Sequence, residues 1–376
     1  MADWSELPLD IVYNFATRIS TYVEEFVVFN CVCKTWRSAA VAAKSRLKPF
    51  GPCLLIANRE YDAMADDEDE ERIRSFYSLY SKKFFNLRLP TQGKKCWGTP
   101  YGWIVTLGQD LKINLLNPFT KTQIALPPTS TFHDEELDNH AKHEEIRQYF
   151  GGKFIFASNP SYWNTTPPPS HLVVAIYGAA RRLAFATPED KAWTTLDQIG
   201  VNKDVIFFNG HFYAVNFGGA LRICDLDKTR PRVTDIASPP DGVFGFNSFY
   251  LVDVSNNLHL VERSIVAEGD ADYHVNTLAF KVFMFDFNKS EWVKVKDFHD
   301  YALFIGNSVS FAISSSEYSA FKGNCIYFTD DHYESYDTGF CDMGVYDYEK
   351  GTIEKFFSGH DKDSIFSRPV FFMPSL

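Results

Sequence analysis

Apolar residues near the amino end recur at helical spacing. Ile11, Phe15 and Ile19 are four residues apart, so one face of a helix would carry all three. Pro8 precedes them, and proline is tolerated in a first helical turn, where its missing N–H would have no partner anyway. A second apolar stretch occupies residues 26–36. The pattern predicts two short helices over residues 1–45.

From residue 50 onward the pattern changes to short apolar runs joined by polar turns that contain lysine. The turn lysines are Lys83, Lys121, Lys191, Lys228, Lys289 and Lys350. The spacings from 83 to 121 and from 191 to 228 match the ~40-residue blade of a β-propeller, and the longer spacings require insertions. Asn, Asp and Gly in these turns supply hairpin geometry. We predict a mainly β protein with one propeller of about six blades over residues 50–376, with seven blades as the alternative.

Composition narrows the functional classes. The chain has 376 residues, and 37 Lys and Arg against 48 Asp and Glu give a net charge of −11, which argues against a binder of nucleic acid or anionic membranes. Aromatic residues make up 16% of the chain, which favours β structure. No apolar run approaches the ~18 residues of a membrane span, and no secretory signal is present. The seven cysteines are scattered, so we expect reduced thiols and a nuclear or cytoplasmic location.

The predicted helices are too small to form a stable domain by themselves. Chains below about 40 residues usually need a metal, disulfides or a partner. Two interpretations remain open on periodicity alone. The apolar stripe packs on the following domain, as most amphipathic helices do, or it presents an apolar face to another protein.

The amino-terminal segment carries an ordered set of motifs. Leu7-Pro8 opens the segment, spaced aliphatic positions follow, and the hexapeptide Val-Cys-Lys-Thr-Trp-Arg at 32–37 closes it. With these motifs the segment resembles an F-box. Glu25-Phe26 stands where many F-boxes have Asp-Leu. The resemblance implies that residues 1–45 dock onto a Skp-type adaptor and, through it, onto a cullin. The positions that the resemblance assigns to this docking are Leu7, Pro8, Ile11, Val12, Phe15, Val32 and Trp36.

The remainder is similar to plant F-box proteins with a C-terminal KIB-type, kelch-like propeller domain. The motifs that carry this resemblance include Gly-Trp-Ile-Val-Thr-Leu at 102–107, Leu-Leu-Asn-Pro-Phe-Thr at 115–120 and Phe-Lys-Gly-Asn-Cys-Ile-Tyr-Phe-Thr-Asp-Asp at 321–331. The similarity spans about residues 4–375. It implies a non-catalytic substrate receptor of an SCF-type ubiquitin ligase that binds an unknown protein target. The target itself and its binding residues do not follow from the family.

Two charged segments contain residues that could support other chemistry. His140 and His143 are three residues apart beside Glu144, a spacing loosely compatible with a metal, but the segment is dense in charge and fits a solvated face better. The acidic run 66–71 could attract a basic substrate segment, although a disordered loop is the simpler interpretation. No nucleotide-binding, hydrolase or metalloprotease motif is present. We therefore predict no metal, no cofactor and no catalytic residue.

Four aromatic residues could contact a partner, because Trp and Tyr are enriched at binding hot spots. They are Trp97, Tyr101, Trp103 and Trp163. Propeller blades also bury aromatic side chains routinely, so a core role is favoured for them.

A second class of function stays open at this point. The chain could be a propeller enzyme, or an interaction scaffold outside the ligase system, in which the helical head has only a structural role. A recognisable acid–base or metal constellation would favour the enzyme, and none is visible in the sequence.

Overall fold

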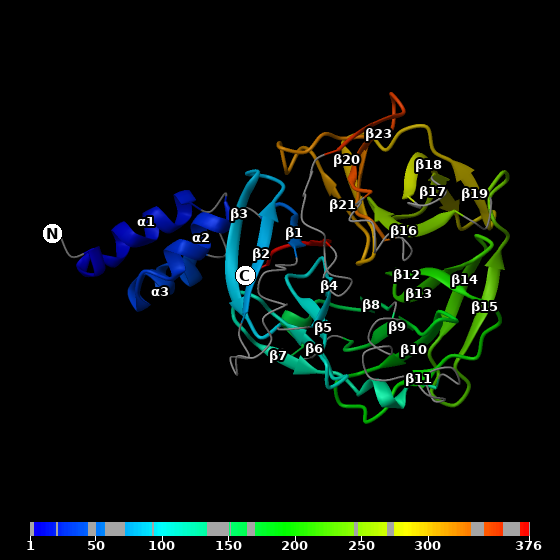
Figure 1. Ribbon diagram of the computed structural model, residues 1–376, viewed down its shortest axis with the longest axis horizontal. Helices are drawn as coiled ribbons and strands as arrows, with labels where there is room; N and C mark the ends of the chain where they lie inside the picture. Colours follow the sequence, from blue (N-terminus) through cyan, green and yellow to red (C-terminus); the bar gives the residue numbers. More distant parts are fainter. Residues whose placement is uncertain are drawn as a thin grey trace.

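The chain forms a small helical head that projects from one side of a ring of six β-sheets (Figure 1). The computed structural model describes residues 4–19, 22–43, 50–56, 72–91, 94–133, 150, 152–163, 170–243, 247–268, 274–331, 342–355 and 369–375. The prediction of a mainly β protein with an amino-terminal helical segment and a six-bladed propeller is confirmed.

Three α-helices, not two, make up the head, which comprises the described residues between 4 and 43. Their bounds, with the preceding 3-10 turn, are η1 (Trp4–Glu6), α1 (Leu9–Ile19), α2 (Val23–Asn30) and α3 (Lys34–Ala43). The predicted second helix breaks because the Cys31 and Val32 amides donate to carbonyls three residues back, at Val28 and Phe29. These shorter bonds tighten the end of α2 before α3 begins.

Each sheet is one blade of the propeller, numbered here in chain order. Blade 1 contains β1 (Cys53–Ile56), β2 (Arg72–Ser78) and β3 (Lys83–Leu89), and blade 2 contains β4 (Lys95–Gly98), β5 (Ile104–Leu107), β6 (Ile113–Leu116) and β7 (Gln123–Ala125). Blade 3 contains β8 (Lys153–Phe156), β9 (Val173–Tyr177), β10 (Arg182–Ala186) and β11 (Thr194–Thr195), and blade 4 contains β12 (Asn202–Phe208), β13 (His211–Asn216), β14 (Leu221–Asp225) and β15 (Arg232–Ala237).

The last two blades complete the ring. Blade 5 contains β16 (Ser248–Val254), β17 (Asn257–Glu268), β18 (His274–Asp286) and β19 (Glu291–Lys294), and blade 6 contains β20 (Tyr301–Ile305), β21 (Phe311–Ser314), β22 (Cys325–Phe328), β23 (Gly344–Asp347) and β24 (Thr352–Glu354). Two 3-10 turns, η3 (Thr129–Thr131) and η4 (Pro160–Tyr162), lie in the connections. Blade 6 departs from the regular antiparallel order because β20 pairs with β22 in parallel.

The carboxyl-terminal strand closes the ring. β25 (Val370–Phe372) pairs antiparallel with β1, with Phe372 opposite Cys53. On its other side the Met373 amide donates to the Thr99 carbonyl of blade 2 at 3.2 Å. Gly98 permits this approach, since a Cβ there would stand 1.8 Å from the Phe371 carbonyl oxygen. Blade 1 is therefore built from both ends of the propeller sequence.

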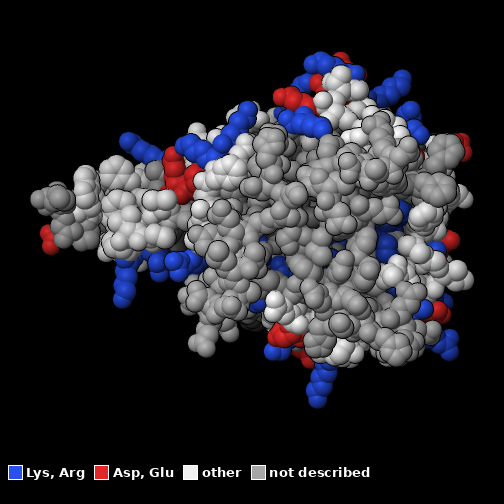
Figure 2. Space-filling model, viewed as in Figure 1, with Lys and Arg blue, Asp and Glu red and all other residues white. Residues whose placement is uncertain are grey.

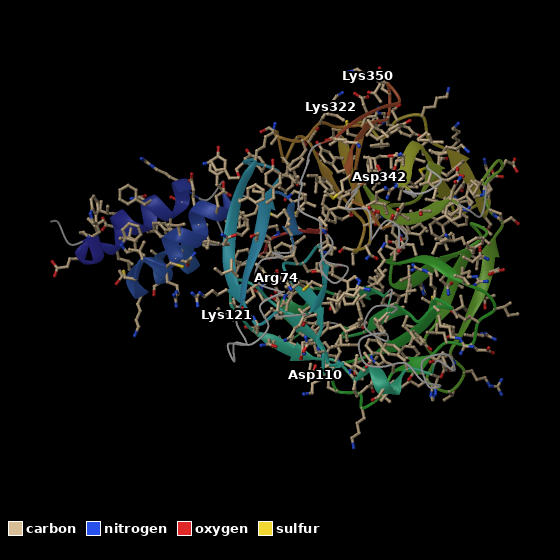
Figure 3. All side chains as sticks on the ribbon, viewed as in Figure 1. Arg74, Asp110, Lys121, Lys322, Asp342 and Lys350 are labelled. Atoms are coloured by element: carbon tan, nitrogen blue, oxygen red, sulfur yellow. The ribbon has the colours of Figure 1, made fainter. Side chains whose placement is uncertain are left out.

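The turn lysines mark the blades one by one. Each lies in, or directly after, the turn before the outermost strand of its blade, and Figure 3 shows Lys121 and Lys350 at the outer rim. An Asn or Asp side chain orders several of these turns. The Asn117 Oδ1 accepts the Phe119 and Thr120 amides, each at 3.0 Å. Such turns are local and polar, which is why six of them predicted six blades.

Candidate protein-docking surface on the helical head

The inner side of the head is a small apolar core. Val12 and Ala16 of α1 are fully buried, as is Ala40 of α3, and Phe29 of α2 is 5% exposed. Asp10 in the first turn and Arg18 in the last turn of α1 complement the helix dipole. Small alanines on α3 allow α1 and α3 to approach closely, and these two helices make the most extensive contact within the head.

The head also exposes a set of large apolar side chains to solvent. We call this the head face and define it by the exposed large apolar side chains of residues 4–32. They are Trp4, Leu9, Ile11, Phe15, Tyr22, Val28 and Val32. Uncharged side chains cover much of the visible surface of the head in Figure 2. An apolar set this dense on so small a unit is typical of a protein-interaction surface.

Trp36 connects the elements of the head. Its ring lies 4.5 Å from that of Phe29, centroid to centroid, so α2 and α3 are held together. Its indole Nε1 donates to the Trp4 carbonyl at 3.1 Å, which fastens η1 to α3 across 32 residues of sequence. Trp36 is only partly buried. It can therefore support the head face and still contribute to it.

The seven sequence-predicted docking residues fall into three groups. Pro8, Ile11, Phe15 and Val32 are exposed, and Leu7 and Trp36 are partly buried. Val12 is fully buried in the head core, so it holds the helices together beneath the face and does not reach the surface. Trp4, Leu9 and Val28 were not among the predicted residues. Their exposure depends on how the three helices pack, which spacing along one helix does not reveal.

The head is anchored to blade 1 through α2. The Phe26 ring lies 5.7 Å from Phe50, and Tyr22 lies 5.8 Å from Tyr80, with the Lys83 ammonium 5.8 Å from the Tyr22 ring. These contacts join the head core and the blade 1 core into one apolar cluster. The helices that carry the head face are thus fixed on the propeller, with Tyr22 at the junction, and the side chains that define the face remain exposed.

One carboxyl group is buried at this junction. Glu24 of α2 is 7% exposed, and neither of its oxygens has a hydrogen-bond partner among the described residues. Burial raises the pKa of the nearby Cys53 thiol well above its usual value, and the charge of Glu24 raises it further. Cys53 is therefore an inert core residue and not a reactive thiol.

Other sequence candidates lie elsewhere or beyond the described residues. Trp97, Trp103 and Trp163 are buried, which confirms the core interpretation, and Tyr101 is partly buried beside them. His140, His143 and Glu144 lie outside the described residues, as does the run 66–71. Within the described residues, no group of three potential metal ligands comes together. No described helix has the length and apolar character that a bilayer crossing requires.

Buried ion pairs connect neighbouring blades, and the sequence did not predict these pairs. The Arg263 guanidinium of blade 5 bonds Asp331 Oδ1 at 2.9 Å and Asp342 Oδ2 at 3.0 Å, both next to blade 6. The Lys153 ammonium of blade 3 lies 2.7 Å from Asp204 of blade 4. Figure 3 shows Asp342 within the propeller, among its sheets. Each set joins residues far apart in sequence, so no local pattern announces it.

Comparison with known proteins gives a consistent assignment. Residues 76–347 match the model of the KIB1-4 beta-propeller family, so "kelch-like" is only a loose description. The chain is 24% identical to the F-box protein SKIP23 of Arabidopsis thaliana, over 94% of this chain and 91% of that protein. It is 26% identical to the putative F-box protein At5g55150 of the same plant, over 88% and 87% of the two chains.

Two of the solved structures to which the chain is similar have low TM-scores. A structure of YCF48 bound to D1 peptide gives a TM-score of 0.34 at 13% identity, over 61% of this chain and 64% of that chain. The Pan2 WD40 domain of Neurospora crassa gives 0.31 at 12% identity, over 65% of each chain. The family match, the F-box relatives and the six-bladed ring together show that the chain belongs to the KIB1-4 beta-propeller family and is a plant F-box protein with a propeller domain.

Proposed function

We propose that the chain is the substrate-recognition subunit of an SCF-type ubiquitin ligase. Residues 1–45 act as the F-box and dock onto a Skp-type adaptor, and through it onto a cullin. Residues 50–376 form the propeller that holds a target protein. The chain then contributes proximity between target and ubiquitin-transfer machinery, and supplies no nucleophile of its own.

The observation that carries this proposal is the exposed head face. Leu9, Ile11 and Phe15 of α1 are 57%, 40% and 42% exposed, although the same helix buries Val12 and Ala16 completely. Exposing apolar side chains to water costs about 25 cal/mol per Å², so a cluster of them is maintained where a partner covers it. The F-box relatives support the identity of that partner as an adaptor.

Co-expression with a Skp-type adaptor tests the proposal. We expect the intact chain to co-purify with the adaptor and the Ile11→Asp, Phe15→Asp double variant to lose it, because two carboxylates would be buried in an apolar interface. Leu278→Asp is the matched control, since Leu278 is an apolar residue of the propeller with 58% exposure. It should leave capture unchanged.

Deleting residues 1–45 separates the two modules. The ring closure between β1 and β25 lies outside the deleted segment, so the propeller should keep a cooperative thermal transition while adaptor capture is lost. Failure of the intact chain to capture the adaptor would refute the ligase role. Capture that survives both the double variant and the deletion would refute the head face as its site.

A further inference from the structure

A polar pocket lies between blades 3 and 4, away from the head. It has a volume of about 540 Å³, within the usual range of ligand sites. The residues that give it its chemical character are Arg182, Thr195, Asp197, Gln198, Arg230 and Arg232. Arg182 begins β10 of blade 3, whereas Arg230 and Arg232 precede and begin β15 of blade 4. In Figure 2 basic side chains, with a few acidic ones, lie along this lower right edge of the propeller.

The walls of the pocket are fixed by backbone hydrogen bonds. After β11 the chain crosses to blade 4, where the Asp197 amide donates to the Pro231 carbonyl and the Val233 amide donates to the Asp197 carbonyl, both at 2.9 Å. On the other side the Leu196 amide donates to the Leu183 carbonyl of blade 3, also at 2.9 Å. The pocket is thus part of the seam between two blades, and its shape does not depend on a free loop.

The charge of the pocket is opposite to that of the whole chain. Three arginines and one aspartate line it, which gives +2 against a net charge of −11 for the protein. Arg232 forms an ion pair with Asp225 at the exposed rim, where its Nε lies 3.6 Å from the Asp225 Oδ2. Within the described part of the chain, the guanidinium groups of Arg182 and Arg230 make no hydrogen bond or ion pair. Two arginines are therefore available to an incoming anion.

An apolar residue is displayed beside this cationic site. Ile199 follows directly after Gln198 and is 88% exposed. Its loop is well held, because the Arg222 Nη2 donates to the Ile199 carbonyl at 2.7 Å and the Asn202 amide group donates to Gln198 Oε1 at 3.0 Å. Arg222 and Asn202 are themselves buried. Ile199 is thus fixed in an exposed position next to the arginines.

We propose that this pocket binds a phosphorylated segment of a client protein. The phosphoryl group sits on Arg182 and Arg230, with Arg232 at the rim, and an apolar residue of the same segment packs on Ile199. The planar guanidinium fork matches phosphate oxygens, and the charge of a phosphoserine near neutral pH, about −1.5 to −2, balances the +2 of the lining. A single carboxylate would leave half of that charge uncompensated. That the bound segment belongs to a client rests on the proposed ligase function, whereas the phosphate site is inferred from the pocket alone.

The test uses the full chain without adaptor and three degenerate nonapeptide pools that differ only at the central residue: phosphoserine, serine or glutamate. We expect the phosphoserine pool to be retained about tenfold or more above the other two, with apolar residues enriched near the phosphoserine. The Arg182→Gln, Arg230→Gln variant should lose this excess. Arg88→Gln, an exposed arginine of blade 1, is the matched control and should keep it. Equal retention of the three pools, or an excess that survives in the double variant, would overturn the proposal.

Hydrogen exchange on the intact chain gives a second measurement that needs no variant. Bound phosphoserine peptide should slow exchange of the Asp197 and Val233 amides, and unchanged exchange there under saturating peptide would also overturn the site. Adaptor capture by the double variant should equal that of the intact chain. Phosphopeptide binding without adaptor capture would refute the ligase role and support the phosphate site. Adaptor capture without phosphopeptide binding would refute only the phosphate site.

Discussion

The head and the propeller use apolar side chains in opposite ways. Of the fourteen exposed large apolar residues among those described, seven belong to the head, which is about a tenth of the chain. The propeller instead buries many aromatic residues between its blades. Phe304 of blade 6, for example, is fully buried 5.2 Å from Phe371 of blade 1. The buried apolar residues of the propeller therefore serve folding, whereas the exposed ones of the head face are free to serve association.

The first prediction concerns ring closure and has the largest expected effect. Phe372 is fully buried in β25 and lies 5.8 Å from Phe76 and 6.3 Å from Phe119. Phe372→Ala should lower the free energy of unfolding by about 3–5 kcal/mol, because it leaves a cavity at the joint between the chain ends. Denaturant unfolding measures this effect.

Phe84→Ala is the control for that change. Phe84 lies on β3 of the same blade but is 58% exposed, so its truncation should cost less than about 1 kcal/mol. The contrast between the regions is contradicted if Phe372→Ala and Phe84→Ala lower the free energy of unfolding equally. It also fails if Phe15→Ala of the head destabilises the chain as much as Phe372→Ala does.

The second prediction concerns the junction between the two regions. Glu24→Met should raise the free energy of unfolding by about 1–3 kcal/mol, because it removes a buried carboxyl group that has no hydrogen-bond partner among the described residues. Glu24 also lies in the first turn of α2, where a negative charge is favourable by about 0.3–1 kcal/mol, and this smaller effect should not reverse the sign.

Glu25→Met is the matched control for the junction. Glu25 occupies the next position of the same helical turn but is exposed, so its replacement should only remove the favourable charge and lower the free energy of unfolding by about 1 kcal/mol or less. Thermal unfolding of both variants measures these changes. If Glu24→Met lowers the stability of the chain, the prediction is wrong and the Glu24 carboxyl group stabilises the junction.

Local signals explain what the sequence predicted well. The six polar turns with lysine mark the six blades, and the described residues between 4 and 43 are largely helical, because turn chemistry and helical periodicity act within a few residues. The number of helices was wrong, since the apolar positions of α2 and α3 run on through the break at 31–33. Val12 was assigned to the docking surface although the packing of α1 on α3 buries it.

Contacts between distant segments explain what was missed. β25 is a three-residue strand that pairs with β1 more than 300 residues earlier, and nothing in Val-Phe-Phe selects that partner. Arg182 and Arg230 lie on different blades, and only the seam between those blades brings them into one pocket. A prediction that aligned consecutive blades could have placed Arg182 at the start of β10 and Arg230 just before β15, on neighbouring blades.

The third prediction has the smallest expected effect and concerns the turn between β23 and β24. The Lys322 ammonium hydrogen-bonds the Asp347 carboxylate, and the Lys350 backbone amide donates to its Oδ1 at 3.1 Å. These bonds lower the pKa of Asp347 from 3.8 to about 2. Figure 3 shows both lysines on the outer edge of blade 6. Because the pair lies near the surface, Asp347→Asn should cost no more than about 1 kcal/mol at pH 7.

The pH dependence of that cost distinguishes the ion pair from the turn. A carboxyl group whose pKa is lower in the folded state stabilises the fold above its unfolded pKa, and this contribution is lost as the pH falls through the folded value. The difference in unfolding free energy between the native chain and Asp347→Asn should therefore be constant down to about pH 4 and shrink between about pH 4 and 2. Asn117 makes the same turn in blade 2, so asparagine should preserve the backbone contact. A difference that does not change with pH would assign the effect to the turn, and the charge of Asp347 would then contribute nothing measurable to stability.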